Sequence, residues 1–334
     1  MLNQVVTAKD RNVELIEMDV PKIEKGHLLL ETEYSAISPG TECLLIRSSD
    51  QGLRHLGYSA VGKVIEVSPD MTGFSVGDRV ACYGAPYVKH ANYLLVPKNL
   101  CAKVPDEVDP KSAALAGLGA IAIHALRQSD IRFGESVFVA GLGVLGQIIA
   151  QIGNAAAYQV CGFDVLEQRS RMLHQFTAIP TFHEQKDLTS FIQWMTDGRG
   201  VDHAILCANG KDTSLIDESL DLLCDRGVVN IVGDLDLNFS REKMFAKEAR
   251  MLISRAGGPG RYDMSYEKGG VDYPYGYVRW TEGRNMAEYL RLVKNLRIDM
   301  SPYTTDVVCL KDLSEAYKEI QEKRSFSLTK LIQF

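Results

Sequence analysis

Several features that place a chain in a specialised class are missing from this sequence of 334 residues. No apolar run reaches the roughly 18 residues that a membrane-spanning helix requires. The N-terminal segment MLNQVVTAKDRNVELIEMDV alternates and is charged, unlike a signal peptide. Positive charge is also in deficit, because the formal net charge is −6, whereas nucleic acids and anionic membranes are normally bound by a basic face. We therefore predict a cytoplasmic protein with neither a nucleic-acid nor a membrane partner.

Cysteine pairs of the type C-x-x-C are absent as well. The seven cysteines are odd in number and widely spaced, which indicates reduced, buried thiols in a cytosolic protein. A redox or nucleophilic role for one of them is the alternative. Low-complexity runs, linkers and internal repeats are also missing. What remains is ordinary globular composition, with 46% hydrophobic and 24% charged residues, in a chain long enough for two domains.

The secondary-structure pattern changes twice along the chain. About the first 125 residues are rich in β-type runs, and the segment 111–128 indicates a helix. From about residue 135 to 235, short apolar strands alternate with helices, which predicts a parallel, doubly wound sheet. The predicted strands are 135–141, 158–164, 203–210 and 228–234, with helices at 144–157 and 214–227. Then follow a predicted long ordered loop, 254–285, two amphipathic helices, 285–296 and 310–323, and a final strand, 327–334.

A glycine-rich motif between a predicted strand and a predicted helix carries the strongest functional signal. It is the run Gly141-Leu142-Gly143-Val144-Leu145-Gly146. The first glycine permits a tight turn, the second lets the backbone approach a pyrophosphate, and the third lets helix and strand pack closely. The helix N-terminus presents unpaired N–H groups and a positive dipole end to the phosphates. The alternative, a glycine-rich turn that binds nothing, does not account for this context.

An acidic residue at the end of the next strand completes the cofactor signal. Asp164 lies eighteen residues after Gly146 and can accept hydrogen bonds from both adenosine ribose hydroxyls. Its charge would repel a 2′-phosphate, so NAD is favoured over NADP. Arg169 lies five residues further on and could flank the ribose.

Motifs spread along nearly the whole chain follow one another in a familiar order: GFSVGDRV at 73–80, HALR at 124–127, GLGVLG at 141–146, Asp164 and LKDLSEAYKEI at 310–320. In these the chain resembles the medium-chain dehydrogenase/reductase superfamily. The resemblance implies an α/β architecture in which a GroES-like β-rich catalytic domain, residues 1–126 and 258–334, is interrupted by a Rossmann NAD-binding domain, residues 127–257. It places the substrate against the nicotinamide between the domains. The superfamily also commonly forms dimers, so we expect a homodimer or homotetramer.

The zinc ligands of the superfamily's alcohol dehydrogenases are not matched in this sequence. Pro39 stands where those enzymes have a cysteine, Tyr58 where they have a histidine, and Gly117 at the third ligand position. The four-cysteine lobe that binds structural zinc is also missing. Since proline and glycine side chains cannot bind zinc and tyrosine binds it poorly, the comparison predicts no metal. His55 and His90 remain as possible ligands, but a lone histidine is more often hydrogen-bonded.

A closer resemblance points to a zinc-free branch and to a class of substrate. The segments ISPGTE, 37–42, and GYSAVG, 57–62, resemble the branch that contains bacteriochlorophyllide hydroxyethyl dehydrogenase. The loop 254–285 resembles dehydrogenase modules from bacterial polysaccharide and sugar gene clusters. The resemblance implies an NAD-dependent, metal-independent enzyme that interconverts a secondary alcohol and a ketone on a sugar, cyclitol or polyol. The alternatives are a zinc-free quinone or enone reductase and a non-catalytic dinucleotide sensor.

Without a metal, side chains must handle the hydroxyl proton. Thr41 matches the family's proton-relay hydroxyl, and Tyr58 replaces a ligand, so we expect both to hydrogen-bond the reacting oxygen, with His55 or His90 as proton acceptor. Alternatively, Tyr58 is an aromatic plug that fills the vacant metal space. Glu42 replaces the family's aspartate, and we count it among the substrate residues. We expect it to be a structural partner for a basic residue, and a catalytic acid is the alternative.

Further contacts to substrate and cofactor are expected from loops. Asn209 and Gly210 follow a predicted strand and should line the nicotinamide side. The aromatic and charged residues of the long loop suit a polyhydroxylated substrate, although an oligomer contact or plain packing is also compatible with them. The expected substrate residues outside the segments already named are Tyr87, Arg261, Tyr262, Tyr266, Tyr277 and Arg279.

Overall fold

A computed structural model describes residues 2–210, 214–322 and 327–334. The chain forms two compact units, which we call unit 1 and unit 2. Unit 1 consists of residues 1–120, 257–296 and 300–334, and unit 2 consists of residues 121–256 and 297–299. The first passage from unit 1 to unit 2 lies inside the helix α3 (Ala116–Gln128).

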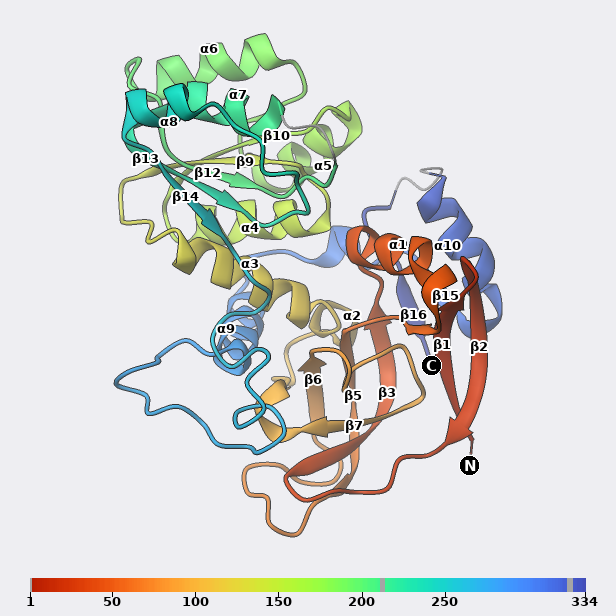
Figure 1. Ribbon diagram of the computed structural model, residues 1–334. Helices are drawn as coiled ribbons and strands as arrows, with labels where there is room; N and C mark the ends of the chain where they lie inside the picture. The colour runs from red at the N-terminus through yellow and green to blue at the C-terminus, as the bar shows by residue number, and fades with distance from the viewer. Residues whose placement is uncertain (1, 211–213, 323–326) are drawn as a thin grey trace. The chain divides into compact units, whose positions relative to one another are not determined.

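Unit 2 is built from short apolar strands that alternate with helices. Its strands are β9 (Ser136–Ala140), β10 (Gln159–Phe163), β11 (Thr181–Phe182), β12 (Val201–Leu206), β13 (Leu223–Ile231) and β14 (Arg250–Ile253). Its helices are α4 (Val144–Ala155), α5 (Glu167–Thr177), α6 (Gln185–Met195), α7 (Ser214–Leu222) and α8 (Arg241–Lys247). Within the described part of this unit, the strands form one parallel sheet in the order β11-β10-β9-β12-β13-β14 (Figure 1). Counted along the chain, this is the order 3-2-1-4-5-6 of a doubly wound dinucleotide-binding fold, and the predicted fold class is confirmed.

The sheet of unit 2 is buried on both faces, as its continuous apolar strands predict. Side chains of α6 and α7 pack with those of the strands in one core cluster, to which α8 adds Met244. On the other face, Asn230 of β13 donates from Nδ2 to the carbonyl oxygen of Ala125 in α3 at 2.8 Å. The helix predicted over 214–227 is shorter than expected, because it ends at Leu222 and the strand β13 already begins at Leu223. Leu223 is completely buried and pairs with Val201, so burial in the core ends the helix early.

Unit 1 is a β-rich body with helices at its edges. Its strands are β1 (Leu2–Lys9), β2 (Asn12–Asp19), β3 (His27–Ala36), β4 (Arg54–His55), β5 (Ser59–Val67), β6 (Arg79–Tyr83), β7 (Tyr93–Pro97), β8 (Cys101–Lys103), β15 (Val307–Cys309) and β16 (Leu331–Gln333). Its helices are α1 (Pro39–Arg47), α2 (Pro110–Ala113), α9 (Glu282–Lys294) and α10 (Leu313–Gln321), with short 3-10 turns at Ser49–Gln51, Lys98–Leu100, Ser301–Tyr303 and Leu310–Asp312.

The sheets of unit 1 are organised around the long strand β3. In the described residues, β15-β16-β3-β5-β6-β8 follow one another in a mixed sheet, and β7 also pairs with β3 (Figure 1). A second sheet has the order β2-β1-β4. The strand β7 pairs with the first half of β3 and β16 pairs with its end, and the pairing of β3 with β5 contains two register shifts. The predicted combination of a β-rich unit and a doubly wound sheet in one chain is therefore confirmed.

The helix predicted over 111–128 and the last predicted helix differ in detail from the sequence expectation, whereas the long loop agrees with it. The helix predicted over 111–128 is divided into α2 and α3, and the glycines of α3 admit neighbouring rings. A Cβ atom on Gly119 would collide with the ring of Tyr289, whose hydroxyl donates to the carbonyl oxygen of Ser112 at 2.8 Å. The loop predicted over 254–285 has no helix or strand between β14 and α9 in the described chain. The last predicted helix begins at Leu313, and its predicted end at residue 323 lies outside the described residues.

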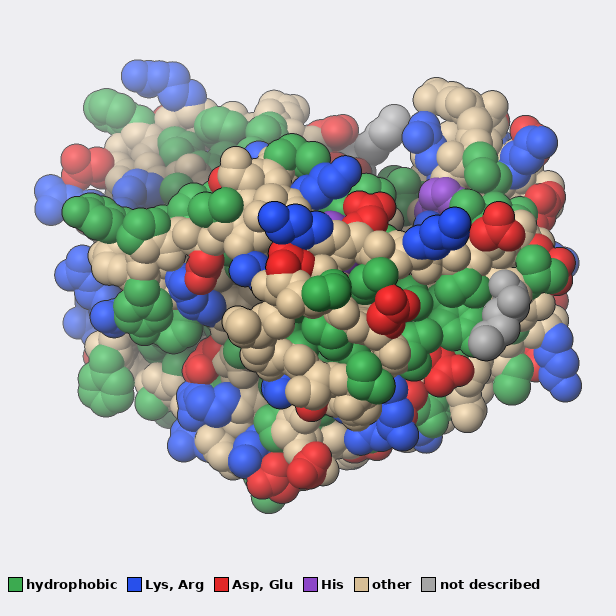
Figure 2. All heavy atoms as spheres, turned by 90° about the horizontal axis from the view of Figure 1, so that it is seen from below, with side chains coloured by type: hydrophobic (Ala, Val, Ile, Leu, Met, Phe, Trp, Pro, Cys, Tyr) green, Lys and Arg blue, Asp and Glu red, His purple; other side chains and the backbone are tan. Residues whose placement is uncertain are grey.

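The length of the helices and the charge of the surface are relevant to binding of membranes and nucleic acids. None of the helices in the ranges that the structure describes is long and apolar enough to cross a membrane. On the face shown in Figure 2, Lys and Arg side chains are interspersed with Asp and Glu side chains, and neither sign dominates a large area.

Candidate functional site

The glycine-rich loop of unit 2 lies between β9 and α4 and needs glycine at two positions for steric reasons. Gly141 has a φ of +90°, and a Cβ atom there would lie 2.7 Å from the backbone nitrogen of Ala208. A Cβ atom on Gly146 would collide with the carbonyl oxygen of Gly141. Around Gly143, in contrast, a Cβ atom would meet nothing within 4 Å. The loop is therefore packed tightly against the chain at its ends and open at its middle, where a phosphate needs backbone access.

The start of α4 supplies the donors for such a phosphate. Gly143 is the N-cap of the helix and Val144 and Leu145 form its first turn, so backbone N–H groups without intrahelical partners lie next to the open space. Gln147, a residue that the motif does not include, donates from Nε2 to the carbonyl oxygens of Leu142 and Arg169, each at 3.0 Å. The residues present therefore fit a dinucleotide pyrophosphate.

Asp164 joins the loop to the end of β10. It is only 4% exposed. Its Oδ2 accepts from the backbone N–H of Leu142 at 2.8 Å and its Oδ1 accepts from that of Leu166 at 2.9 Å. Arg169 reaches the same carboxylate with Nη1 at 3.2 Å. Because a carboxylate can accept about four hydrogen bonds, Asp164 keeps capacity for a ribose hydroxyl while it holds the glycine loop in place.

Asn209 and Gly210 follow β12 and are tied to the end of the next strand. The backbone N–H of Asp234 donates to Oδ1 of Asn209 at 2.8 Å, and that of Gly210 donates to the carbonyl oxygen of Asp234 at 3.0 Å. Both residues are exposed at the carboxyl edge of the parallel sheet, the edge at which ligands bind in doubly wound folds.

In unit 1, Glu42 and His90 form a buried pair. Nε2 of His90 lies 3.0 Å from Oε2 of Glu42, and Nδ1 lies 2.6 Å from the hydroxyl oxygen of Ser35. Glu42 also accepts from the Tyr317 hydroxyl and, at 2.7 Å, from the backbone N–H of Ser38. Both members of the pair are completely buried. In the structure His90 is therefore the basic neighbour of Glu42, and both ring nitrogens of His90 are engaged away from any surface.

Tyr58 and Thr41 meet at one end of this network. The Tyr58 hydroxyl donates to the hydroxyl oxygen of Ser38 at 2.8 Å and is also hydrogen-bonded to Thr41, which is exposed. Burial raises the pKa of Tyr58 to about 12, against the opposing effect of these two hydrogen bonds. Tyr58 thus stays protonated at neutral pH and can donate a hydrogen bond, but it is a poor base.

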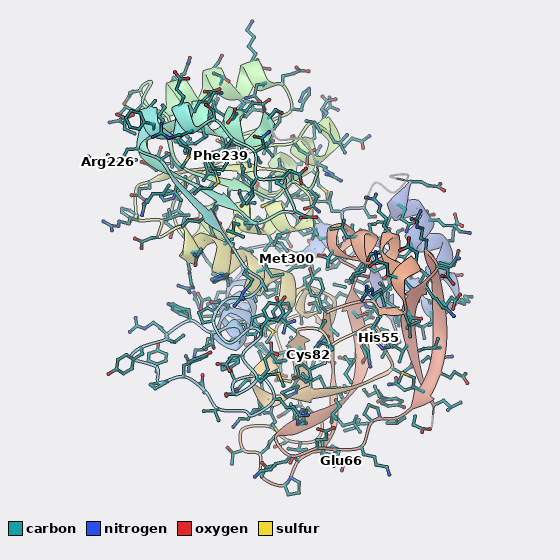
Figure 3. All side chains as sticks on the ribbon, viewed as in Figure 1. His55, Glu66, Cys82, Arg226, Phe239 and Met300 are labelled. Carbon is teal, nitrogen blue, oxygen red and sulfur yellow. The ribbon has the colours of Figure 1, made fainter. Side chains whose placement is uncertain are left out.

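His55 lies apart from this group. His55 is exposed in β4, which pairs with β1. Tyr83, the ring neighbour of Tyr58, follows Cys82 in a different strand, β6, and Figure 3 labels both His55 and Cys82. Partial burial and the nearby Lys89 lower the pKa of His55. The structure does not bring His55 into hydrogen-bond contact with Tyr58.

The charged and aromatic residues of the long loop form a second cluster in unit 1. Arg261 is buried, and its guanidinium donates to Glu267 and to the carbonyl oxygen of Ala85. It also lies over the rings of Tyr262 and Tyr83, at 4.2 and 5.9 Å from their centroids. The predicted residues Arg261 and Tyr262 are therefore neighbours. Burial raises the pKa of Tyr87, and Arg261 lies near enough to Tyr87 to oppose this rise.

Other predicted substrate residues of the loop lie elsewhere. Tyr266 is buried against Tyr273 in a stacked pair with centroids 5.5 Å apart. Tyr277 is 92% exposed, and exposed Arg279 lies over the ring of Tyr275 at 5.3 Å. The loop therefore does not gather all of its aromatic residues into one site.

The metal-ligand positions of unit 1 do not fit zinc. Pro39 is the first residue of α1. A Cβ atom on Gly117 would lie 2.6 Å from Cδ2 of Tyr83 and 2.8 Å from the hydroxyl oxygen of Ser59, so the Tyr83 ring occupies the space of a third ligand. Over the residues that the structure describes, no three His, Cys, Asp or Glu side chains are grouped to hold a metal ion.

Sequence reasoning missed two residues next to this position. Tyr83 packs edge-on against Tyr58, with ring centroids 5.8 Å apart and an interplanar angle of 77°. Glu282, the first residue of α9, lies near Tyr83 and is completely buried. In the sequence, a glutamate that follows Thr281 at the start of a helix is ordinary capping chemistry, so no local signal distinguishes it.

Comparisons with known proteins agree with the fold and the motifs. The family model described as zinc-binding dehydrogenase matches residues 144–267. A sorbitol dehydrogenase from Halalkalibacterium halodurans is 25% identical over 243 residues, which span 62% of this chain and 70% of that protein. A probable D-xylulose reductase A from Emericella nidulans is 24% identical over 302 residues, spanning 80% of this chain and 77% of that protein. The crystal structure of a short chain alcohol dehydrogenase from Escherichia coli CFT073, complexed with cofactor NADH, matches with a TM-score of 0.80 and 15% identity, covering 100% of this chain and 99% of that chain. At that identity the similarity is one of fold.

Proposed function

Because the chain is an alcohol-dehydrogenase-like member of the medium-chain dehydrogenase/reductase superfamily, we propose that it is an oxidoreductase that interconverts an alcohol and a ketone with a nicotinamide dinucleotide. The observation that carries this proposal is the open space over Gly143, bounded by the N-terminus of α4 and by Asp164. The bound nicotinamide would accept the hydride from the alcohol carbon or return it. The chain's own residues would bind the cofactor and manage the hydroxyl proton.

The cofactor is NAD rather than NADP. A buried carboxylate at the end of β10 accepts ribose hydroxyls but repels a 2′-phosphate. Arg169, the nearby cation, is paired with Asp164 and is therefore not presented to a second anion. The pair thus favours a neutral ribose over a phosphorylated one.

The reaction does not use zinc. Support comes from the side chains at the three ligand positions, since two of them cannot bind a metal and the third has a pKa near 12 that disfavours the phenolate. In this setting Tyr58 and Thr41 would hydrogen-bond the reacting oxygen. A hydrogen-bond donor aimed at that oxygen stabilises the negative charge that develops on it during hydride transfer.

The substrate is a small polyhydroxylated molecule such as a sugar, cyclitol or polyol. The names of the two relatives, a sorbitol dehydrogenase and a D-xylulose reductase, describe proteins that act on such compounds. In this chain, Arg261 and Tyr262 of the long loop offer an aromatic face with polar groups close to Tyr83, which suits a ring or chain bearing hydroxyls.

An activity screen on chelator-treated protein tests these statements together. Purified protein is incubated with NAD and a panel of sugars, cyclitols and polyols, NADH absorbance is followed, and zinc is measured on the same sample. Turnover of one substrate group by zinc-free protein is expected. Stoichiometric zinc with chelator-sensitive turnover would refute the metal-free mechanism. Consumption of NADPH with quinones or enones, or cofactor binding without any turnover, would identify the protein as a double-bond reductase or as a sensor.

A further inference from the structure

The serine at the start of α1 does not use its side chain as helix-capping serines normally do. Ser38 is the N-cap of the helix, a position where a serine hydroxyl usually accepts from a backbone N–H of the first turn. In the first turn of α1, all of which the structure describes, no N–H donates to it. The hydroxyl oxygen of Ser38 instead accepts from the Tyr58 hydroxyl at 2.8 Å. This side chain is therefore committed to the proposed reaction site.

The backbone of Ser38 is held on both sides by Glu42. The N–H of Ser38 donates to Oε1 of Glu42 at 2.7 Å, and its carbonyl oxygen accepts from the backbone N–H of Glu42 at 2.9 Å. Oε2 of Glu42 lies 3.0 Å from Nε2 of His90 and accepts from the Tyr317 hydroxyl. Because α1, α10 and the segment before β7 meet at this carboxylate, three parts of unit 1 fix the position of Ser38.

The side chain of Tyr58 is also held in place. Its carbonyl oxygen accepts from the backbone N–H of Gly84 at 2.8 Å, and its ring packs edge-on against Tyr83. Ser38 is 7% exposed, so water competes little for the hydrogen bond between the two hydroxyl groups. Both partners therefore have fixed positions, and what can change between them is the direction of the hydrogen bond.

The partner of Tyr58 is a hydroxyl group, which can both donate and accept, whereas a carboxylate only accepts and an ammonium group only donates. Over the same 2.8 Å, Ser38 can accept from the Tyr58 hydroxyl or donate to it. The two forms of the proposed substrate require such a partner. An alcohol can donate its hydroxyl proton to the Tyr58 oxygen, whereas a ketone oxygen can only accept. Thr41, the other residue bonded to Tyr58, is exposed, so water competes for its hydrogen bonds.

We propose that Ser38 is a positioning residue that sets the direction of the Tyr58 O–H bond and reverses it between the two forms of the substrate. This proposal rests on the proposed alcohol oxidation. With the alcohol bound, Tyr58 donates to Ser38 and accepts from the substrate hydroxyl. With the ketone bound, Ser38 donates to Tyr58, and Tyr58 donates to the carbonyl oxygen.

Neither residue changes its number of protons between the two complexes, because each keeps one hydroxyl proton. When the alcohol is oxidised, its C–H bond breaks and the electron pair leaves as hydride for the nicotinamide. The O–H bond breaks, the C=O bond forms, and the one proton that is released in total is taken up by water. Ser38 thus acts on the reaction through Tyr58 and does not touch the substrate.

Nuclear magnetic resonance of full-length protein with isotope-labelled Cζ atoms in its tyrosines tests the contact without turnover. The Tyr58 resonance is the one that is missing from Tyr58→Phe. Ser38→Ala should shift this resonance, and Ser38→Thr, which keeps the hydroxyl, should return it close to its wild-type position. Ser48→Ala is the matched control and should leave it in place, since Ser48 lies at the other end of α1 and donates to the carbonyl oxygen of Leu45. A Tyr58 resonance that does not respond to Ser38→Ala would overturn the proposal.

The same resonance tests the reversal in two complexes that cannot react, one with NADH and the alcohol and one with NAD and the ketone. In wild-type protein its position should differ between them. Ser38→Ala should reduce this difference, because Tyr58 without its partner donates to the substrate oxygen in both complexes. An equal difference in wild type and Ser38→Ala would refute the reversal.

Turnover tests the connection to the reaction. Ser38→Ala should lower kcat about tenfold in both directions, the size of effect expected when one hydrogen bond between neutral groups is lost, and leave KM within a few fold. Ser38→Thr should restore most of the rate. In the Tyr58→Phe background, Ser38→Ala should cause no further loss, since the partner hydroxyl is already gone.

A purely structural role for Ser38 would give losses that add in the double variant, and this result, or wild-type kcat in Ser38→Ala, would contradict the proposal. If wild-type protein turns over no alcohol or ketone, the proposed function fails. The Tyr58 resonance then still decides whether Ser38 directs the Tyr58 hydroxyl.

Discussion

Two glutamates of unit 1 show how the surroundings of a residue decide what it can do. Glu42 and Glu282 are both completely buried. Glu42 is surrounded by donors from His90, Tyr317 and the backbone of Ser38, whereas Glu282 has no donor among the described residues. A buried carboxylate with satisfied oxygens is a structural element, and one without donors is stabilised by taking up a proton.

The pKa of Glu282 predicts a specific dependence of stability on pH. Because the folded-state pKa, about 8, lies above the unfolded value of 4.5, folded protein binds the proton more tightly. The contribution is fully present below pH 4.5 and is lost as the pH rises to about 8, at up to about 1.4 kcal/mol per pH unit. Urea unfolding of wild type and Glu282→Gln between pH 5 and pH 8 checks this, and the variant should show a flatter dependence. Parallel curves for the two proteins would contradict it.

The Tyr58 hydroxyl should matter for the reaction and little for the fold. Tyr58→Phe keeps the ring contact with Tyr83 but removes the hydroxyl that donates to Ser38. We expect kcat to fall by roughly 10²-fold, the size of effect seen when one donor to a developing oxyanion is removed, with little change in the thermal midpoint. Tyr34→Phe in β3 is the control. Unchanged turnover in Tyr58→Phe would show that the ring is an aromatic plug in the vacant metal space.

Among structural elements, the strand–loop–helix unit of β9 and α4 contains two glycines that should respond differently to substitution. Gly146 has no room for a side chain, whereas Gly143 has open space. Gly146→Ala should destabilise unit 2, because the new methyl group collides with the carbonyl oxygen of Gly141. Overpacking of this kind typically costs about 1–3 kcal/mol. Gly143→Ala should fold normally, since its methyl group meets open space, but should bind NADH at least tenfold more weakly because that space is where the pyrophosphate approaches. Calorimetric titration with NADH and thermal unfolding of both variants measure the two effects. Equal loss of stability in both variants would contradict this interpretation.

The same elements show what a sequence reveals and what it conceals. The glycine loop and Asp164 could be predicted because they lie within one strand–helix–strand stretch, where spacing and hydrophobic pattern are local. The parallel, doubly wound character of the sheet could be predicted from the alternation of elements, whereas the order of its strands was not predicted. The polar cluster of unit 1 consists of residues from four separate segments of the chain. Tyr58 lies directly before β5, Tyr83 lies in β6, Arg261 lies in the long loop and Glu282 lies in α9. No spacing rule connects such residues, so sequence reasoning does not find Tyr83 or Glu282.

For the whole molecule, the two units divide the chemical work between them. The residues proposed to bind the cofactor all lie in unit 2, and Tyr58 and Thr41, which are proposed to hydrogen-bond the reacting oxygen, lie in unit 1. A chain of two compact units need not unfold in a single step. Ligands that bind only one unit should therefore stabilise mainly the transition that belongs to that unit.

Cofactor preference should accordingly be visible in the unfolding of the whole protein. At a concentration one hundred times its Kd, NADH should add about 2.7 kcal/mol of stability and raise the midpoint of the unit 2 transition. NADPH at the same concentration should raise it much less, because Asp164 repels the 2′-phosphate. Asp164→Asn should narrow the difference between the two cofactors, whereas Asp187→Asn, an exposed residue of α6, should leave it unchanged. Differential scanning calorimetry with both cofactors makes the measurement. Equal stabilisation of wild-type protein by NADH and NADPH would show that the Asp164–Arg169 pair does not select the cofactor.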